Sequence, residues 1–131
     1  MKLPKRQLTT MKTKLTTLKH EGELTEDNPF MKKNETQITR IILRKLRENF
    51  PGVWYKIHGG PYQEAGIPDI VGCYKGRLCA FEVKTPQKRT NVSLAQQYQI
   101  DRLTKAGALV HVVTSWDDVA FFMQNVFGVP K

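Results

Sequence analysis

Two carboxylates and a lysine lie where two apolar segments of the chain begin and end, in a spacing that suits metal chemistry. Asp69 opens one segment, and Glu82 and Lys84 close the next. The dipeptide Lys75-Gly76 between the segments is typical of a two-residue β-hairpin turn. In that register Asp69 faces Glu82, and directly opposed like charges destabilise a sheet. A purely structural hairpin should avoid this pair, so we expect it to have a chemical role.

A divalent cation would remove the conflict between the two acids. Carboxylate oxygens are hard ligands that suit magnesium, and the charge of the ion keeps both groups ionised where proximity would raise one pKa. Lys84 lies two residues beyond Glu82, so the alternation of a strand places both side chains on one face. The sequence therefore predicts a metal site at the end of the hairpin with a lysine beside it.

Two further polar residues are candidates for this site, each with a structural alternative. Glu35 precedes Ile38 and Ile42 at helical spacing, so it shares their inward helix face. A carboxylate in the first turn is, however, also favoured by the helix dipole. Gln96 follows Ser93 at the spacing of a capping box, which accounts for it without any chemistry. Both alternatives stay open at the level of sequence.

The elements that must position these residues follow the order α-β-β-β-α-β-α. We expect a helix over 34–50 with Asn34 as its N-cap, a strand over 53–58, a loop over 59–68, the hairpin over 69–84, a basic loop over 85–92, a helix over 93–106 ended by Gly107, a buried strand over 109–114 and a last helix through 127. These elements predict an α/β fold with a mixed central sheet flanked by helices and an extra C-terminal helix. His111 lies among the apolar residues of the last strand and is interpreted as a core histidine.

Length and composition exclude several classes of protein. A chain of 131 residues suits one domain, and its apolar runs are far shorter than a membrane helix, which needs about 20 residues. The N-terminus lacks the apolar region of a secretory signal, so we expect a reducing, cytoplasmic setting. Cys73 and Cys79 match no zinc spacing, fall on opposite faces of the hairpin and are interpreted as small buried hydrophobic residues. No Gly-rich phosphate-binding motif is present, so no nucleotide cofactor is expected.

The charge of the chain points to a polyanionic partner, with DNA as the first candidate. Lys and Arg number 21 against 12 Asp and Glu, which gives a net charge of +9. Residues 1–32 predict a flexible basic arm ahead of a domain over 33–131, although a plain solvated tail is an equal alternative. Candidate DNA contacts in the domain are Lys56, His58, Lys88 and Arg89, and those in the arm are Lys2, Lys5, Arg6, Lys12, Lys14 and Lys19. Lys56 is also typical of an amphipathic lysine at a sheet edge.

The same residues resemble a known nuclease pattern. Pro68-Asp69, a hairpin and Glu82-Val83-Lys84 resemble the PD-(D/E)XK nuclease superfamily, whose core order of α-β-β-β-α-β matches residues 34–114. The segments 66–71 and 81–86, Ser93-x-x-Gln96, and Lys105-Ala106-Gly107 resemble more narrowly the VRR-NUC family, which includes small stand-alone phage and bacterial proteins. Residues 1–32 have no counterpart in the family pattern.

The resemblance implies a role for each candidate residue. By resemblance, Asp69 and Glu82 ligate magnesium or manganese together with the backbone carbonyl of Val83, and Lys84 orients or activates the attacking water. Glu35 resembles an outer or second-metal ligand, and Gln96 a glutamine that lines the site. The implied activity is metal-dependent hydrolysis of phosphodiester bonds in DNA, in a bacterial or phage-infected cell and in repair or recombination.

The expected substrate is a DNA structure more than a DNA sequence. The core has no long insertion that could read bases, so we expect recognition of branched DNA such as a Holliday junction or a flap. Alternatives are a nuclease acting on other forms of DNA and a non-catalytic DNA-binding module on the same fold. The presence of Asp69, Glu82 and Lys84 argues against the module, because binding alone would favour the loss of acids from a phosphate-facing surface.

The last helix predicts a homodimer. Val119, Phe122, Met123 and Val126 form one core-facing stripe, which leaves Phe121 and Phe127 pointing elsewhere. Such aromatic residues favour an interface between two copies, with two additional core contacts as the alternative. A two-fold dimer would present two metal sites on one face, as paired incisions across a junction require.

Overall fold

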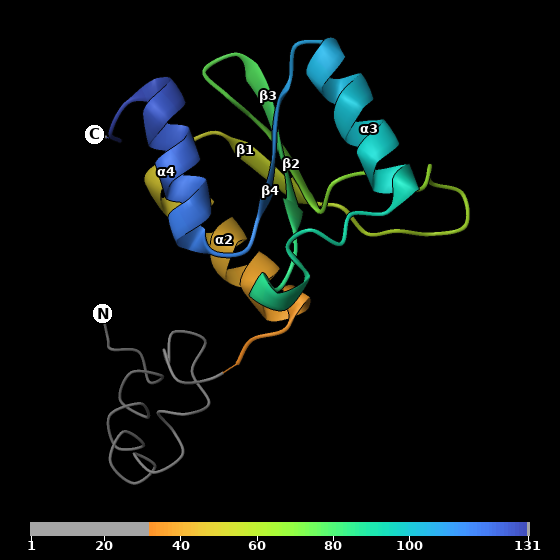
Figure 1. Cartoon of the computed structure of the whole chain (residues 1–131). Coiled ribbons are helices and arrows are strands. Elements are labelled where there is room, and N and C mark those ends of the chain that lie inside the picture. Colours follow the sequence, from red (N-terminus) through yellow and green to blue (C-terminus); the bar gives the residue numbers. More distant parts are fainter. Residues whose placement is uncertain (1–31, 131) are drawn as a thin grey trace, which may run out of the picture. The chain divides into compact units, whose positions relative to one another are not determined.

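The computed structural model describes residues 32–130, and its elements follow the predicted order (Figure 1). They are α2 (Glu35–Asn49), β1 (Val53–Lys56), β2 (Ile70–Tyr74), β3 (Arg77–Val83), the short 3-10 helix η2 (Pro86–Lys88), α3 (Leu94–Lys105), β4 (Leu109–Val113) and α4 (Trp116–Phe127). No helix in this range is long and apolar enough to cross a membrane. The predicted arm over 1–32, with its six candidate DNA contacts, lies outside the described residues except for its last position.

The strands form one mixed sheet in the order β1-β2-β3-β4. The first three are antiparallel neighbours, and β4 runs parallel to β3 because α3 carries the chain back across the sheet. The hairpin has the predicted register, from Tyr74 opposite Arg77 to Ile70 opposite Phe81. Its two turn residues have positive φ angles, as a type I′ turn requires. The register, continued by one residue, places Asp69 opposite Glu82.

The helices begin at the predicted caps. The Asn34 side chain accepts a hydrogen bond from the Gln37 N–H at 2.9 Å, and the Gln37 side chain accepts one from the Asn34 N–H at 3.0 Å. Ser93 and Gln96 form the same reciprocal pair at the start of α3. Ser115 accepts from the Asp118 N–H at the start of α4. These local bonds fix where each helix starts, independently of the rest of the fold.

The core lies between the sheet and the pair α2 and α4, while α3 lies on the other side of the sheet beside β4 (Figure 1). Ile42, Leu46, Phe81 and Met123 are fully buried in it. Burial of each such side chain contributes about 1.5–3 kcal/mol to the free energy of unfolding. This apolar layer holds β3 rigidly, and β3 carries Glu82 at its end.

Two interpretations of single residues were wrong. His111 is exposed and stacks on Phe122 with ring centroids 4.8 Å apart, because β4 is a half-buried edge strand and not the buried strand that was expected. Cys73 is exposed, whereas Cys79 is buried as expected and both thiols are free. The two cysteines do point to opposite faces, and Cys79, unlike Cys73, belongs to the hydrophobic core.

The buried stripe of α4 differs from the predicted one. Val119 and Met123 are buried as expected, but Val126 is 41% exposed and Phe127 packs edge-on against Tyr74 with ring centroids 4.9 Å apart. Trp116 sets this phase, because at the first turn of α4 it packs against the core and so directs positions 119, 123 and 127 inward. Phe127 is therefore a core residue. Only Phe121 of the predicted aromatic pair points outward.

Candidate active site

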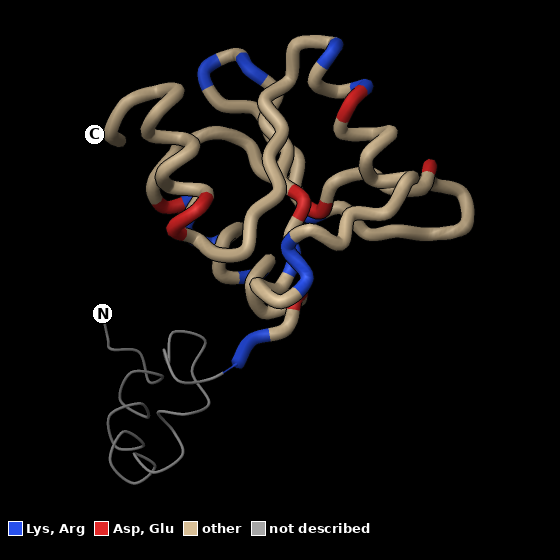
Figure 2. Tube along the Cα trace, viewed as in Figure 1, with Lys and Arg blue, Asp and Glu red and all other residues tan. Residues whose placement is uncertain are grey.

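Asp69 and Glu82 meet at the end of the hairpin. Asp69 immediately precedes β2, and its Oδ2 accepts a hydrogen bond of 2.7 Å from the backbone N–H of Val83, the last residue of β3. Pro68, which is fully buried, immediately precedes it, and the proline ring fixes the φ angle of Pro68 itself. Acidic and basic positions lie close together in this region in Figure 2. The two carboxyl groups that the register predicts to be opposed are therefore held together by the sheet itself.

Glu82 is a buried acid, with only 3% of its surface exposed. Burial is the largest cause and the neighbouring charge of Asp69 the second, and together, against the opposing charge of Lys84, they raise the pKa of Glu82 to about 8. At neutral pH and without a cation, Glu82 therefore retains a proton. An acid held neutral by its surroundings is the state that a divalent cation would change, because the ion replaces the proton as the source of positive charge.

Lys84 and Gln96 complete the cluster. The Lys84 ammonium lies 3.8 Å from Glu82 Oε2 and donates a hydrogen bond of 3.0 Å to Gln96 Oε1. Gln96 Nε2 donates to Glu82 Oε2 at 2.7 Å, and Gln96 Oε1 also accepts from the Ser93 N–H at 2.9 Å. The capping interpretation of Gln96 is confirmed, while its role in the chemistry stays a prediction. One amide caps α3 and contacts two members of the candidate site.

Glu35 lies near this cluster, and its role as an outer or second-metal ligand stays a prediction. It is half-buried in the first turn of α2, and its negative charge is among the causes that raise the pKa of Glu82. Among residues 32–130, no group of three His, Cys, Asp or Glu side chains is arranged to hold a metal ion. Asp69 and Glu82 are the two carboxylates that lie side by side here, and the charge of Glu35 acts on Glu82.

The chemistry of this donor set fits magnesium or manganese. Magnesium is usually bound through one or two carboxylates, with water and substrate oxygens completing its octahedral shell. Asp69 and Glu82 provide two such groups side by side, and the charge of Lys84 offsets the raised pKa of Glu82 only in part. A metal held by Asp69 and Glu82 would need further ligands from the backbone, water or substrate, and the carbonyl of Val83 is adjacent to Glu82 in the chain.

The candidate DNA contacts of the domain are all exposed, but one of them is engaged. Lys56, His58 and Lys88 lie on the surface. The first two flank Ile57, whose N–H donates to the Asp69 backbone carbonyl at 2.8 Å. Their backbone therefore lies beside that of Asp69, and strand alternation directs their side chains to the other face of the sheet. The Arg89 guanidinium instead donates to Thr114 Oγ1 at 3.0 Å and lies 3.6 Å from Asp118. Arg89 therefore has a structural role at the start of α4.

Sequence reasoning missed the contacts that fix the loop before Asp69. Gln99 is buried, and its Nε2 donates to Glu64 Oε1 at 3.0 Å and to the Ala65 carbonyl at 3.3 Å. Arg102 lies 3.2 Å from the same Glu64 oxygen, and these two partners, with Gln99 as the larger cause, lower the pKa of Glu64. No pattern distinguishes Gln99 from the other glutamines of α3.

Gly66 is the one residue of this loop whose type signals the arrangement. It has a φ of +83°, and a Cβ atom there would lie 2.3 Å from the carbonyl oxygen of Ala95 in α3. Only glycine permits both this backbone conformation and this approach. The loop is therefore packed directly on the first turn of the helix that also carries Gln96.

Comparisons with known proteins give the fold but little sequence similarity. No protein-family model matches the sequence, and no curated protein matches it. A solved structure described as "VRR_NUC domain protein" matches with a TM-score of 0.58 and 20% identity, over 76% of this chain and 97% of its own. Another, described as "VRR_NUC domain", matches with a TM-score of 0.58 and 21% identity, over 71% of this chain and 97% of its own. This chain therefore has the fold of the VRR_NUC domains, a mixed α/β fold of the PD-(D/E)XK type.

Proposed function

We propose that this protein is a metal-dependent endodeoxyribonuclease of the VRR-NUC type that hydrolyses phosphodiester bonds in branched DNA. The observation that carries the proposal is the buried Glu82 carboxyl, opposed to Asp69 and flanked by Lys84, in a spacing that resembles the Asp…Glu-x-Lys pattern of the nuclease superfamily. Such a group is costly in a structural sheet, because a buried acid without a cation is destabilising. Metal binding would explain why the two opposed carboxylates are present despite this cost.

The residues of the cluster divide the work of hydrolysis. Magnesium or manganese, held by Asp69, Glu82 and the carbonyl of Val83, would polarise the phosphate and lower the pKa of the attacking water. The Lys84 ammonium stabilises the negative charge that develops on the phosphate in the transition state. Gln96 orients Lys84 through Oε1 and Glu82 through Nε2, so one amide sets the distance between the cation and the acid.

The DNA is held by basic residues around the carboxylate end of the sheet. Lys56 and His58 flank the contact between β1 and Asp69, and Lys88 lies in η2 shortly after Lys84. The arm over 1–32 would add affinity through counterion release, consistent with the net charge of +9. These contacts reach the phosphate backbone and carry no sequence information, which favours recognition of shape.

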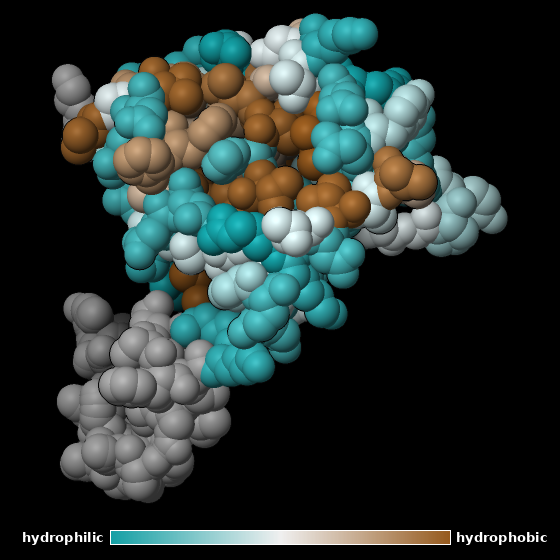
Figure 3. Space-filling model, in the orientation of Figure 1, coloured by the Kyte–Doolittle hydropathy of each residue, from teal (hydrophilic) through white to brown (hydrophobic). Residues whose placement is uncertain are grey.

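The proposed active form is a homodimer with α4 at its interface. Phe121 projects from α4 with 70% of its surface exposed, and β4 is an unpaired edge of the sheet among the described strands. Figure 3 shows apolar side chains gathered on the face that contains α4 and β4. We assign this face to a second copy of the chain, because a two-fold interface requires no other protein. Two sites on one face would permit paired cuts across a junction.

The proposal is tested by cleavage assays on a panel of DNA structures. Labelled four-way junction, flap, duplex and single-stranded DNA are incubated with the protein in magnesium, in manganese and in EDTA. We expect cleavage of the branched substrates with either metal and none in EDTA. Metal-independent binding without cleavage of any substrate would instead favour a non-catalytic DNA-binding module.

A further inference from the structure

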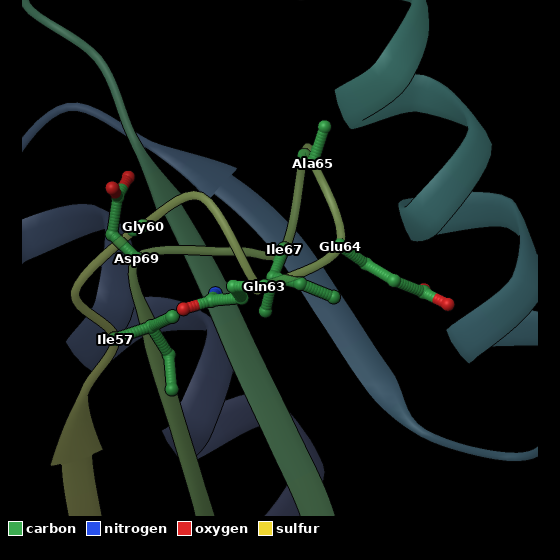
Figure 4. A pocket seen from close by; sticks show the side chains of 9 residues that line it. Ile57, Gly60, Gln63, Glu64, Ala65, Ile67 and Asp69 are labelled. Carbon is green, nitrogen blue, oxygen red and sulfur yellow. The ribbon is translucent and has the colours of Figure 1, made fainter.

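A pocket of about 260 Å³ lies beside Asp69, within the connection between β1 and β2 (Figure 4). Ordinary small-molecule pockets have volumes of about 300–1,000 Å³. This pocket is therefore suited to a flat group of the size of one nucleobase, or to a similarly small fragment. Because Asp69 is both a lining residue and a proposed metal ligand, an occupant of the pocket would lie next to the scissile phosphate.

The wall of the pocket is formed in advance by contacts with α3. Gln99 holds Glu64 and the Ala65 carbonyl, and Gly66 packs against the backbone of Ala95. A binding site with fixed walls avoids the entropy cost of ordering a loop when its ligand arrives. The shape seen in the free protein can therefore be the shape that binds.

The lining of the pocket favours an uncharged group with hydrogen-bonding edges. In Figure 4 the Gln63 amide is directed toward Ile57, while the Glu64 carboxylate is directed away toward α3. Ile57 and Ile67 supply apolar surface, and the Gln63 amide supplies one donor group and one acceptor. The lining residues include two acids and no Lys or Arg, so a phosphate group would be repelled.

We propose that this pocket receives the base of an unpaired nucleotide next to the scissile phosphate, with Gln63 bonded to the edge of the base. The inference rests on the proposed nuclease function and gives it a source of selectivity. A paired base is stacked in the duplex and must be unstacked before it can enter such a pocket, whereas an unpaired base enters without that cost. The pocket would thus favour flaps, junction strands and single-stranded segments over intact duplex.

The test uses flap DNA in which the base is removed at one unpaired position at a time. DNA affinity is measured in EDTA, and kcat/KM for cleavage is measured in magnesium. For the wild-type protein we expect one position near the cut at which loss of the base weakens binding and lowers kcat/KM by about tenfold, a factor within the range of one good contact to a base edge. Gln63→Ala should show this loss with the base present and no further loss when the base is removed.

Two controls keep the result interpretable. The Gln63 side chain is half-exposed, and the loop is held through Glu64 and Gly66, so Gln63→Ala should fold with an unchanged melting temperature. Gln97→Ala removes a comparable amide that bonds Asp101 on α3, outside the pocket, and should retain the full dependence on the base.

Wild-type affinity and kcat/KM that are the same with and without a base at every unpaired position would overturn the pocket assignment. The assignment would also be overturned if removal of the base lowered the DNA affinity and kcat/KM of Gln63→Ala as much as those of the wild type. Cleavage that ignores the base contradicts the pocket and leaves the nuclease function in place. Conversely, base-dependent binding by a protein that cuts no DNA contradicts the nuclease function and supports the pocket.

Discussion

The burial of Glu82 in the fold disfavours the ionised carboxylate that the proposed metal site requires. Its carboxyl lies at the end of β3 with almost no contact with solvent, and burial, with Asp69 as the second cause, raises its pKa from 4.5 to about 8. Between these two values the folded protein holds a proton that the unfolded chain has released. The free energy of unfolding must therefore fall as the pH rises through this window.

This linkage gives a prediction for stability in the absence of metal. With EDTA present, the free energy of unfolding of the wild type should decrease between about pH 5 and about pH 8, measured by urea denaturation. Glu82→Gln cannot ionise and should show a flatter profile. Magnesium should reduce the decrease in the wild type only, because the ion takes the place of the proton. Parallel profiles for the two proteins in EDTA would contradict the raised pKa.

Variants of Lys84 and Lys88 should distinguish an effect on the chemical step from an effect on DNA binding. Lys84 contacts Glu82 and Gln96, whereas Lys88 lies on the surface of η2. Lys84→Ala should lower kcat by about 10²-fold or more, as deletion of a transition-state charge donor does, with little change in the Kd for DNA. Lys88→Ala should weaken DNA binding and leave kcat unchanged at saturating DNA. A Lys84→Ala protein that cuts normally at saturation would make Lys84 a phosphate contact only.

At the scale of elements, α3 is the part of the fold that assembles the site. Its first turn carries Gln96, which contacts Glu82 and Lys84, and its next turn carries Gln99, which fixes the loop before Asp69. The helix thus reaches both carboxylates, one directly and one through the loop. A single rigid element can set their separation.

Gly66 tests this role of α3 without altering any polar group. Gly66→Ala introduces a Cβ atom at a φ of +83°, in contact with the Ala95 carbonyl, so the loop must move away from α3. The strain of that conformation alone costs roughly 1–2 kcal/mol of unfolding free energy, and we expect a lower melting temperature and slower cleavage. Gly59→Ala is the matched control for stability, because a Cβ there meets nothing within 4 Å. Equal melting temperatures would contradict the packing described here.

Some features of the fold are predicted from the sequence and others are not. The difference is whether a feature depends on neighbouring residues or on residues far away in the chain. The caps at Asn34 and Ser93 and the Lys75-Gly76 turn depend on a few neighbouring residues, so their positions and the opposition of Asp69 and Glu82 were correctly predicted. Exposure depends on what packs against an element from elsewhere in the chain. The interpretations of His111, Cys73 and the stripe of α4 failed for that reason.

At the scale of the whole molecule, the net charge of +9 of the full chain and the exposed Phe121 of α4 indicate how the protein would meet its partners. In the proposed function the first would attract DNA from solution and the second would offer a surface to another copy. Neither feature is needed for the fold itself, because the core between the sheet and α2 and α4 is complete without them. The two surfaces can therefore be changed by mutation without unfolding the domain.

Phe121→Glu tests the proposed homodimer. The exposed side chain contributes little to the core, so the variant should fold with a melting temperature close to that of the wild type. By light scattering we expect a dimeric wild type and a monomeric variant that makes single nicks in junction DNA in place of paired cuts. Val126→Glu, also exposed on α4, reports whether the interface extends along the helix. A monomeric wild type that makes paired cuts would exclude the dimer.

The central claim, that Asp69 and Glu82 form the metal site of a nuclease, is tested most directly by cleavage of one branched DNA by three proteins. Asp69→Asn keeps an oxygen that can accept the Val83 N–H, and Glu82→Gln keeps the size of the side chain, so both variants should fold and bind DNA. We predict that the wild type cuts in magnesium and is silent in EDTA, and that both variants bind the DNA but do not cut it. Cleavage at the wild-type rate by either variant would contradict the account.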